Sequence, residues 1–178
     1  EKGLGALASR IKIADMYMSL GDFKSALPIC ERGFDISKEI TDKNTSNLMI
    51  KYFSNQLSSV LCELGDYERA IELQEDVVKF YITAFGSEDA DTFTALNNLA
   101  MIYRSAGDVE RAEQIFEELY KDLKSLLGDE HPTALICLGN IASLKIQLEE
   151  YGEALQIIEP LYEVKRRVFG EDHPHTLD

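Results

Sequence analysis

The sequence predicts an all-α fold, a right-handed superhelix of four helical hairpins followed by the start of a fifth. Three observations predict it. A glycine-containing turn recurs at nearly constant spacing, a second turn keeps the same step, and the apolar residues between the turns recur at helical spacing.

The first turn motif is a glycine and an aspartate followed by an apolar residue. Its copies are Leu20-Gly21-Asp22-Phe23, Leu64-Gly65-Asp66-Tyr67, Ala106-Gly107-Asp108-Val109 and the degenerate Glu149-Glu150-Tyr151. Positions 21, 65, 107 and 149 are 44, 42 and 42 residues apart. Nearly equal steps of this size indicate four copies of one helical repeat.

The second turn motif places a glycine where a helix should stop and, in two copies, a proline where the next helix should start. The copies are Phe85-Gly86-Ser87-Glu88, Leu127-Gly128-Asp129-Glu130-His131-Pro132 and Phe169-Gly170-Glu171-Asp172-His173-Pro174. The two motifs together divide each repeat into two antiparallel helices. The expected pairs are 4–20 with 23–39, 47–64 with 67–84, 90–106 with 109–126, and 132–148 with 151–168.

These helices form one expected domain over residues 1–178, which we interpret as a fragment of a longer protein. Its repeats are expected at about 4–42, 47–86, 90–128 and 132–170, with 173–178 beginning a fifth. A proline inside the last second helix, Pro160, predicts a kink near Gln156.

Two columns of equivalent residues predict the packing of the second helices. Small residues, expected where the helices of a hairpin cross, are Ala26, Ala70, Ala112 and Ala154. Bulky residues, expected to bury against the next repeat, are Phe34, Val78, Tyr120 and Tyr162.

These columns also carry a family resemblance. The run from Leu96 through Asn97-Asn98-Leu99-Ala100-Met101-Ile102 to Tyr103, followed by Gly107 and Ala112, resembles a tetratricopeptide repeat. The 42-residue step and the Leu-Gly-Asp-Glu-His-Pro linker are similar to the repeats of kinesin light chains, and Ala26-Leu27-Pro28-Ile29-Cys30 is similar to a segment of their second helices. The resemblance implies a scaffold that binds a peptide or protein segment in a concave groove lined by the first helices.

Side chains of the first helices that do not pack are the candidate binding residues. The predicted partner-binding set is Tyr52, Asn55, Ser59, Asn97, Asn98, Met101, Arg104, Asn140, Ser143 and Gln147. Amides donate and accept, so they can pair with an extended backbone. The alternative is that the repeated asparagines satisfy nearby loop carbonyls.

By the resemblance, Asn98, Asn140 and Arg104 match groove residues of kinesin light chains. Asp15, Gln56, Cys62 and Ser143 occupy places where a groove for acidic peptides would carry cations. Ile11, Asp15 and Thr94 similarly argue against a clamp for chaperone tails. The resemblance therefore leaves the partner unnamed.

Composition excludes several other functions. The net charge of −14 disfavours nucleic acid and anionic membranes, and no apolar run approaches the length of a membrane span. The distant cysteines Cys30, Cys62 and Cys137 and the lack of a signal peptide predict reduced thiols in a cytoplasmic protein. We expect no cofactor and no enzymatic activity, because no phosphate loop or nucleophile motif is present.

Two further clusters have structural interpretations. His131, His173 and His175 lie near acidic residues, but each of the first two precedes a proline at a helix start, which favours a linker over a metal site. The basic run Lys165-Arg166-Arg167 is placed to interact with a helix C-terminus. The main alternative to peptide binding is an architectural spacer that self-associates through its open ends.

Overall fold

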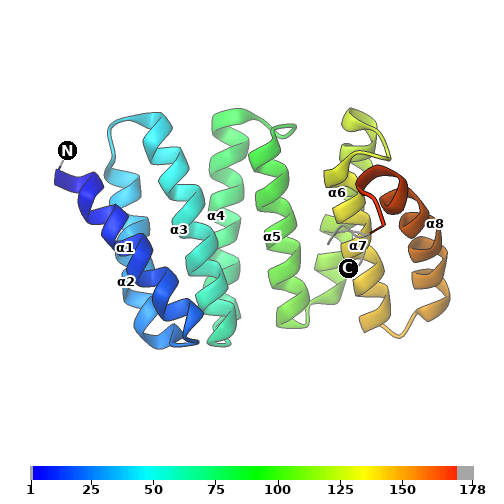
Figure 1. Cartoon of the computed structure of the whole chain (residues 1–178), viewed down its shortest axis with the longest axis horizontal. Helices are drawn as coiled ribbons and strands as arrows, with labels where there is room; N and C mark the ends of the chain where they lie inside the picture. Colours follow the sequence, from blue (N-terminus) through cyan, green and yellow to red (C-terminus); the bar gives the residue numbers. More distant parts are fainter. Residues whose placement is uncertain (1, 172–178) are drawn as a thin grey trace. The chain divides into compact units, whose positions relative to one another are not determined.

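The structure, a computed structural model, describes residues 2–171, with side chains from residue 7 on. Within these residues the chain forms helices and no strand (Figure 1). The helices are α1 (Lys2–Ser19), α2 (Phe23–Glu39), α3 (Lys43–Glu63), α4 (Tyr67–Phe85), α5 (Ala90–Ala106), α6 (Val109–Leu127), α7 (Pro132–Gln147) and α8 (Tyr151–Phe169). The predicted all-α architecture of four hairpins is confirmed, whereas the expected fifth repeat at 173–178 lies outside the described residues.

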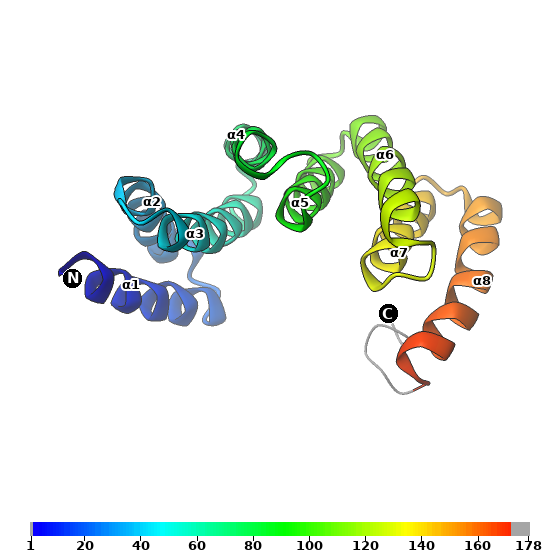
Figure 2. The ribbon, with the colours of Figure 1, turned by 90° about the horizontal axis from the view of Figure 1, so that it is seen from above.

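The chain divides into two compact units, Glu1–Phe80 and Tyr81–Asp178. In the first unit α2 packs on both α1 and α3, and Figure 2 shows these helices side by side. In the second unit α5 packs on α6, α6 on α7, and α7 on α8. Within each unit, these helices pack on their neighbours in the sequence, as in a stack of hairpins.

The recurring glycine–aspartate turn ends one helix and begins the next. Gly21, Gly65 and Gly107 have φ of 71°, 76° and 85°, a left-handed conformation that glycine adopts without a Cβ clash. The aspartate that follows caps the second helix: the Asp22 and Asp108 carboxylates each accept a backbone N–H at 3.2 Å, three residues on. These two roles explain why both residues recur.

The fourth copy of this turn keeps the conformation without the glycine. Glu149 has φ of 62°, and Glu150 at the cap position makes no side-chain capping bond. A left-handed residue with a Cβ is strained by roughly 1–2 kcal/mol. Glu149→Gly should therefore raise the free energy of unfolding by about 1 kcal/mol, measured by urea denaturation followed by circular dichroism. The converse change in the matched turn, Gly107→Glu, should lower it, and equal stability of both variants with the parent would contradict this account.

The third helix begins earlier than predicted. Its start was expected at 47, but α3 begins at Lys43, because the Asp42 carboxylate accepts the Thr45 N–H at 2.8 Å and caps it. The hydrogen bond to Thr45 lowers the pKa of Asp42, as expected for a bond that favours the ionised form.

The small-residue column is confirmed and the bulky column is wrong in part. The four column alanines are all buried, with exposed fractions of 0–2%. In the bulky column only Val78 is buried, Phe34 and Tyr120 are half-buried, and Tyr162 is 42% exposed. The buried bulk lies one position earlier, at Val77, Leu119 and Leu161, because that position points more directly at the helix partner.

The first repeat has a glycine at this buried position, and a ring fills the space. Gly33 is buried in α2, and a Cβ built on it would overlap the ring of Phe53 on α3. Phe53 has no exposed surface and meets Tyr52 edge-on. Gly33 therefore lets α2 and α3 approach around a buried phenylalanine.

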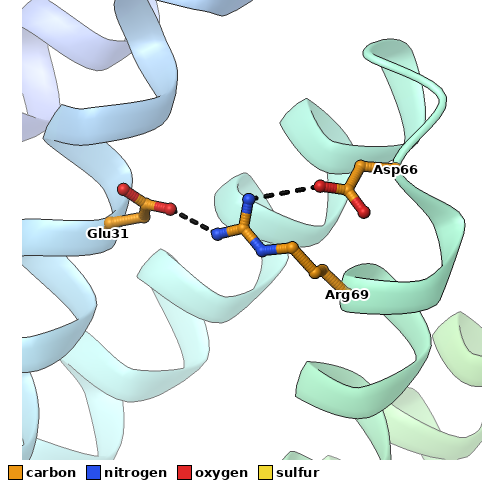
Figure 3. A network of polar contacts seen from close by, with 3 residues as sticks. All are labelled: Glu31, Asp66 and Arg69. Atoms are coloured by element: carbon orange, nitrogen blue, oxygen red, sulfur yellow. Dashed lines mark hydrogen bonds and ion pairs between the residues drawn. The ribbon is translucent and has the colours of Figure 1, made fainter.

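An arginine joins α4 to α2 within the first unit. Figure 3 shows the Arg69 guanidinium between Glu31 of α2 and Asp66 of the preceding turn. The Arg69 and Glu31 side chains are 48% and 39% exposed, so solvent screens the pair and its contribution is below about 1 kcal/mol. The network therefore contributes little to the stability of the first unit.

Helix α8 continues through Pro160 to Phe169. The kink expected near Gln156 stays a prediction.

Candidate functional site

The predicted binding residues lie on the first helix of a hairpin and fall into two groups. Tyr52, Asn55 and Ser59 lie on α3 in the first unit. The second group, on α5 and α7 of the second unit, is Asn97, Asn98, Met101, Arg104, Asn140, Ser143 and Gln147. All of them are exposed or half-buried, which is consistent with their expected place outside the packed core.

In the first unit the predicted residue Tyr52 is engaged by a neighbouring helix. Its hydroxyl donates to Asp15 of α1 at 2.6 Å, and the Gln56 amide donates to Asp15 at 2.7 Å and to the Tyr52 oxygen at 2.9 Å. Burial, followed by the bond to Asp15, raises the pKa of Tyr52 to about 12. This cluster links α1 to α3 and engages the Tyr52 hydroxyl, which the sequence analysis assigned to a ligand.

In the second unit the structure brings two predicted asparagines together. The Asn140 amide of α7 donates to the Asn97 oxygen of α5 at 2.7 Å, and the Asn97 amide lies 3.7 Å from the Met101 sulfur. An amide group has two donors and an acceptor oxygen. Asn140 therefore keeps hydrogen-bonding capacity while the contact holds it in place.

The hydroxyls beside these amides are turned back to their own helices. Thr94, Ser105 and Ser143 each donate to the carbonyl four residues earlier, at 2.9–3.0 Å. A hydroxyl whose proton is used in this way can still accept a hydrogen bond. These residues therefore present acceptors rather than donors.

The face also carries one cation and three exposed apolar side chains. Arg104 lies half-buried in the last turn of α5, and no carboxylate among the described residues lies within ion-pair distance of it. Met101, Ile136 and Ile146 are 38%, 38% and 46% exposed. We call this surface the α5–α7 face. It consists of the three amides, the other predicted residues of the second unit and five neighbours: Asn97, Asn98, Asn140, Met101, Arg104, Ser143, Gln147, Thr94, Ser105, Ile136, Gly139 and Ile146.

Sequence reasoning missed a lysine that joins three segments of the second unit. The Lys145 ammonium of α7 lies 2.6 Å from Glu113 of α6, 2.8 Å from Glu150 and 3.0 Å from Glu153 of α8. Its side chain is 13% exposed, and the hydrogen bonds, led by that to Glu113, raise the pKa of Lys145 above its usual range. The cluster is structural, because its one cation is held by hydrogen bonds to carboxylates from neighbouring segments of the same chain.

His131 and the basic run make contacts within the chain. His131 caps α7 by accepting the Thr133 N–H at Nδ1 (3.3 Å), whereas His173 and His175 lie outside the described residues. No group of three His, Cys, Asp or Glu residues in the described chain is placed to hold a metal ion. Arg166 and Arg167 pair with Glu163 and Glu130, so carboxylates as well as the helix end hold the basic run.

The three cysteines are unpaired thiols, as the sequence predicts. Burial raises the pKa of Cys30 to about 11 and that of Cys137 to about 12, so both remain protonated at neutral pH. The Cys137 thiol donates to the Phe116 carbonyl at 3.4 Å. Burial raises the pKa of Cys62 as well, so none of the three thiols is activated as a thiolate.

Comparison with protein families decides the class of the chain. Residues 48–125 and 91–159 match one model of the tetratricopeptide repeat, and residues 7–40 match another. The chain belongs to the tetratricopeptide repeat family. No curated protein sequence matches it. As the described part of the chain shows, no helix of this tetratricopeptide repeat protein is long and apolar enough to cross a membrane.

Solved structures share the fold. One is a Podosopora anserina protein named as a kinesin light chain with nearly identical TPR-like repeats, at 22% identity over 96% of this chain and 80% of that chain, with a TM-score of 0.74. BtubC (BKLC) of P. vanneervenii is 22% identical over 98% of this chain and 66% of its own, with a TM-score of 0.75. The apo form of RapI has 12% identity, coverage of 95% and 45%, and a TM-score of 0.74. The predicted kinesin-light-chain-like arrangement of the repeats is therefore confirmed as a fold.

Proposed function

We propose that the protein is an interaction scaffold that binds an extended peptide segment of a partner protein on the α5–α7 face. The observation that carries the proposal is the asparagine pair. The Asn140 amide of α7 donates to the Asn97 oxygen of α5 at 2.7 Å, so the two side chains form a polar contact between two repeats. Beside it stand exposed apolar side chains and a cation without an ion-pair partner in the described residues.

The chemistry of this face suits an extended backbone. Each residue of such a segment offers one donor and one acceptor, and amides supply both complements. Apolar side chains next to the amides provide the contact area from which most binding free energy comes. A cytoplasmic adaptor or regulator is the role that we assign to such a scaffold, with kinesin-type cargo binding as one form of it.

The proposal is tested with the double variant Asn98→Ala, Arg104→Ala. A displayed library of random peptides, roughly 12 residues long, is selected against the parent chain, and the selected peptides are titrated by fluorescence anisotropy. We expect the double variant to bind them at least about tenfold more weakly, because two central polar contacts are lost. Unchanged affinity would refute the proposal.

The matched control is Gln114→Ala on α6, an exposed amide away from this face. It should leave the affinity unchanged. Circular dichroism and urea denaturation of each variant separate a lost contact from a lost fold.

Self-association through an exposed helix face is the second candidate, and α8 favours it. Tyr151, Leu155 and Tyr162 are 58%, 55% and 42% exposed and recur at helical spacing. Sedimentation velocity over a range of concentrations would detect a dimer. A dimer that persists in the Asn98→Ala, Arg104→Ala variant but disappears in Leu155→Lys would favour this architectural role.

A further inference from the structure

The charge of the molecule is distributed unevenly between first and second helices of the second unit. The α5–α7 face consists of Thr94, Asn97, Asn98, Met101, Arg104, Ser105, Ile136, Gly139, Asn140, Ser143, Ile146 and Gln147. Arg104 is the one charged residue in this set, although 28% of all residues are charged. This face therefore differs from the rest of an acidic chain.

The second helix of the third repeat shows the contrast. The charged residues exposed on α6 are Glu110, Arg111, Glu117, Glu118, Lys121, Asp122 and Lys124. Helices α5 and α6 belong to one hairpin, so the difference is between faces and not between regions of the sequence. The exposed charges of this hairpin are therefore concentrated on α6 and not on the α5–α7 face.

A nearly uncharged face disfavours charged ligand side chains of either sign. Removing a carboxylate or ammonium from water costs several kcal/mol unless a counter-charge meets it. Among the residues of the face there is no carboxylate for a cation and one arginine for an anion, and the carboxylate at the start of α5, Asp91, is half-buried. At long range the net charge of −14 repels acidic segments as well.

The groups that are present fit a neutral segment. Met101, Ile136 and Ile146 provide exposed apolar surface for aliphatic or aromatic side chains. The amides of Asn98 and Asn140 can pair with backbone groups between those side chains. The Arg104 guanidinium has five N–H donors, which can serve backbone carbonyls as well as a carboxylate.

On the basis of the proposed function, we infer that the α5–α7 face selects uncharged segments, in which apolar residues alternate with Ser, Thr, Asn or Gln, over acidic or basic ones. The ligand is thus defined by the absence of charge as much as by its apolar residues. This specificity distinguishes the face from a cation-lined groove.

The test uses the full chain and three displayed libraries of roughly 12-residue segments, matched in apolar content. In the first library the polar positions are Ser, Thr, Asn or Gln; in the second they include Asp and Glu; in the third they include Lys and Arg. Each library is selected on the parent chain and on the Asn98→Ala, Arg104→Ala variant.

We expect enrichment of the uncharged library by at least about tenfold over the other two, and loss of that enrichment in the variant. Enrichment of acidic or basic segments that still depends on Asn98 and Arg104 would overturn this inference and keep the proposed function. Enrichment that does not depend on them, or no enrichment in any library, would overturn both.

Salt dependence gives a second readout. The dissociation constant of a selected uncharged peptide should change less than about twofold between roughly 0.05 and 0.5 M sodium chloride, because no ion pair is screened. A change of about tenfold or more would show that charge pairing supplies the affinity and would overturn the inference.

Discussion

Gly33→Ala should lower the free energy of unfolding by about 2 kcal/mol, although alanine is the better helix former. The new methyl group would overlap the Phe53 ring, which is fully buried and cannot move into solvent. Either α2 and α3 separate or the ring leaves its preferred rotamer, and both responses disrupt close packing. Urea denaturation followed by circular dichroism measures the effect.

A second substitution separates this clash from other effects at Gly33. Phe53→Leu removes part of the ring and leaves a cavity that costs about 1 kcal/mol or more on its own. Combined with Gly33→Ala, the methyl group fills part of that cavity, so the double variant should be more stable than the sum of the single effects by about 1 kcal/mol. Strict additivity would show that the two residues do not compete for space.

Gly152→Ala is the matched control for helix propensity. Gly152 lies within α8, and a Cβ at that position would meet nothing within 4 Å. Because Gly152 is the second residue of α8, its replacement should raise the free energy of unfolding by up to about 0.5 kcal/mol. If Gly33→Ala were also stabilising, the proposed role of the Phe53 ring would be wrong.

The repeat register predicted the helices well because each end has its own chemical signal. Glycine, aspartate and proline mark nearly every start and stop, and those signals act within a few residues of chain. Asp42 was missed because it caps α3 outside the recurring motif, in the one step of 44 residues rather than 42. The capping aspartate was present in the sequence, but it did not fall at the position that the 42-residue spacing predicts.

Side-chain packing was predicted less well, because it depends on which of two adjacent positions faces the neighbouring helix. On α2 the prediction was wrong by one position: Phe34 was expected to be buried, but the buried residue is Gly33. The register itself contained a signal: Gly33 is the one small residue in a column with Val77, Leu119 and Leu161. A glycine among bulky residues indicates that a side chain from another helix fills the space.

The sequence predicted which side of the helices the candidate residues occupy, but not which of them bond to one another. Periodicity places Asn97, Asn98 and Asn140 outside the core, and the structure agrees. It could not show that Asn140 donates to Asn97, or that Asp15 holds Tyr52, because each bond joins residues about one repeat apart. The offset between neighbouring first helices decides these contacts, and that offset is a property of the packed hairpins.

Lys145→Met should lower the free energy of unfolding by about 2 kcal/mol, because three carboxylates would then face one another without the cation that holds them. Methionine keeps the length and apolar stem of lysine, so the change tests the charge. Since the pKa of Lys145 is raised in the folded chain, its contribution is complete below the unfolded lysine pKa of about 10.4. The difference between parent and variant should therefore be constant from neutral pH to about pH 9 and shrink as the pH rises further.

The preceding repeat suggests how the loss can be repaired. One repeat of 42 residues earlier, Tyr103 and Arg111 stand where Lys145 and Glu153 stand, and the Arg111 guanidinium lies 5.4 Å from the Tyr103 ring centroid. The tyrosine–arginine pair joins α5 to α6, and the lysine–glutamate pair joins α7 to α8 at the equivalent position of the next repeat. The double variant Lys145→Tyr, Glu153→Arg should thus recover at least half of the stability that Lys145→Tyr loses alone.

Recovery has to come from the pair and not from reduced repulsion among the glutamates. Glu153→Gln combined with Lys145→Tyr removes the same carboxylate without supplying a cation. If it restores as much stability as Glu153→Arg does, the junction needs only fewer negative charges, and the equivalence of the two pairs is wrong. If only Glu153→Arg restores it, the cation is the required element, and its place can be on either helix of the junction.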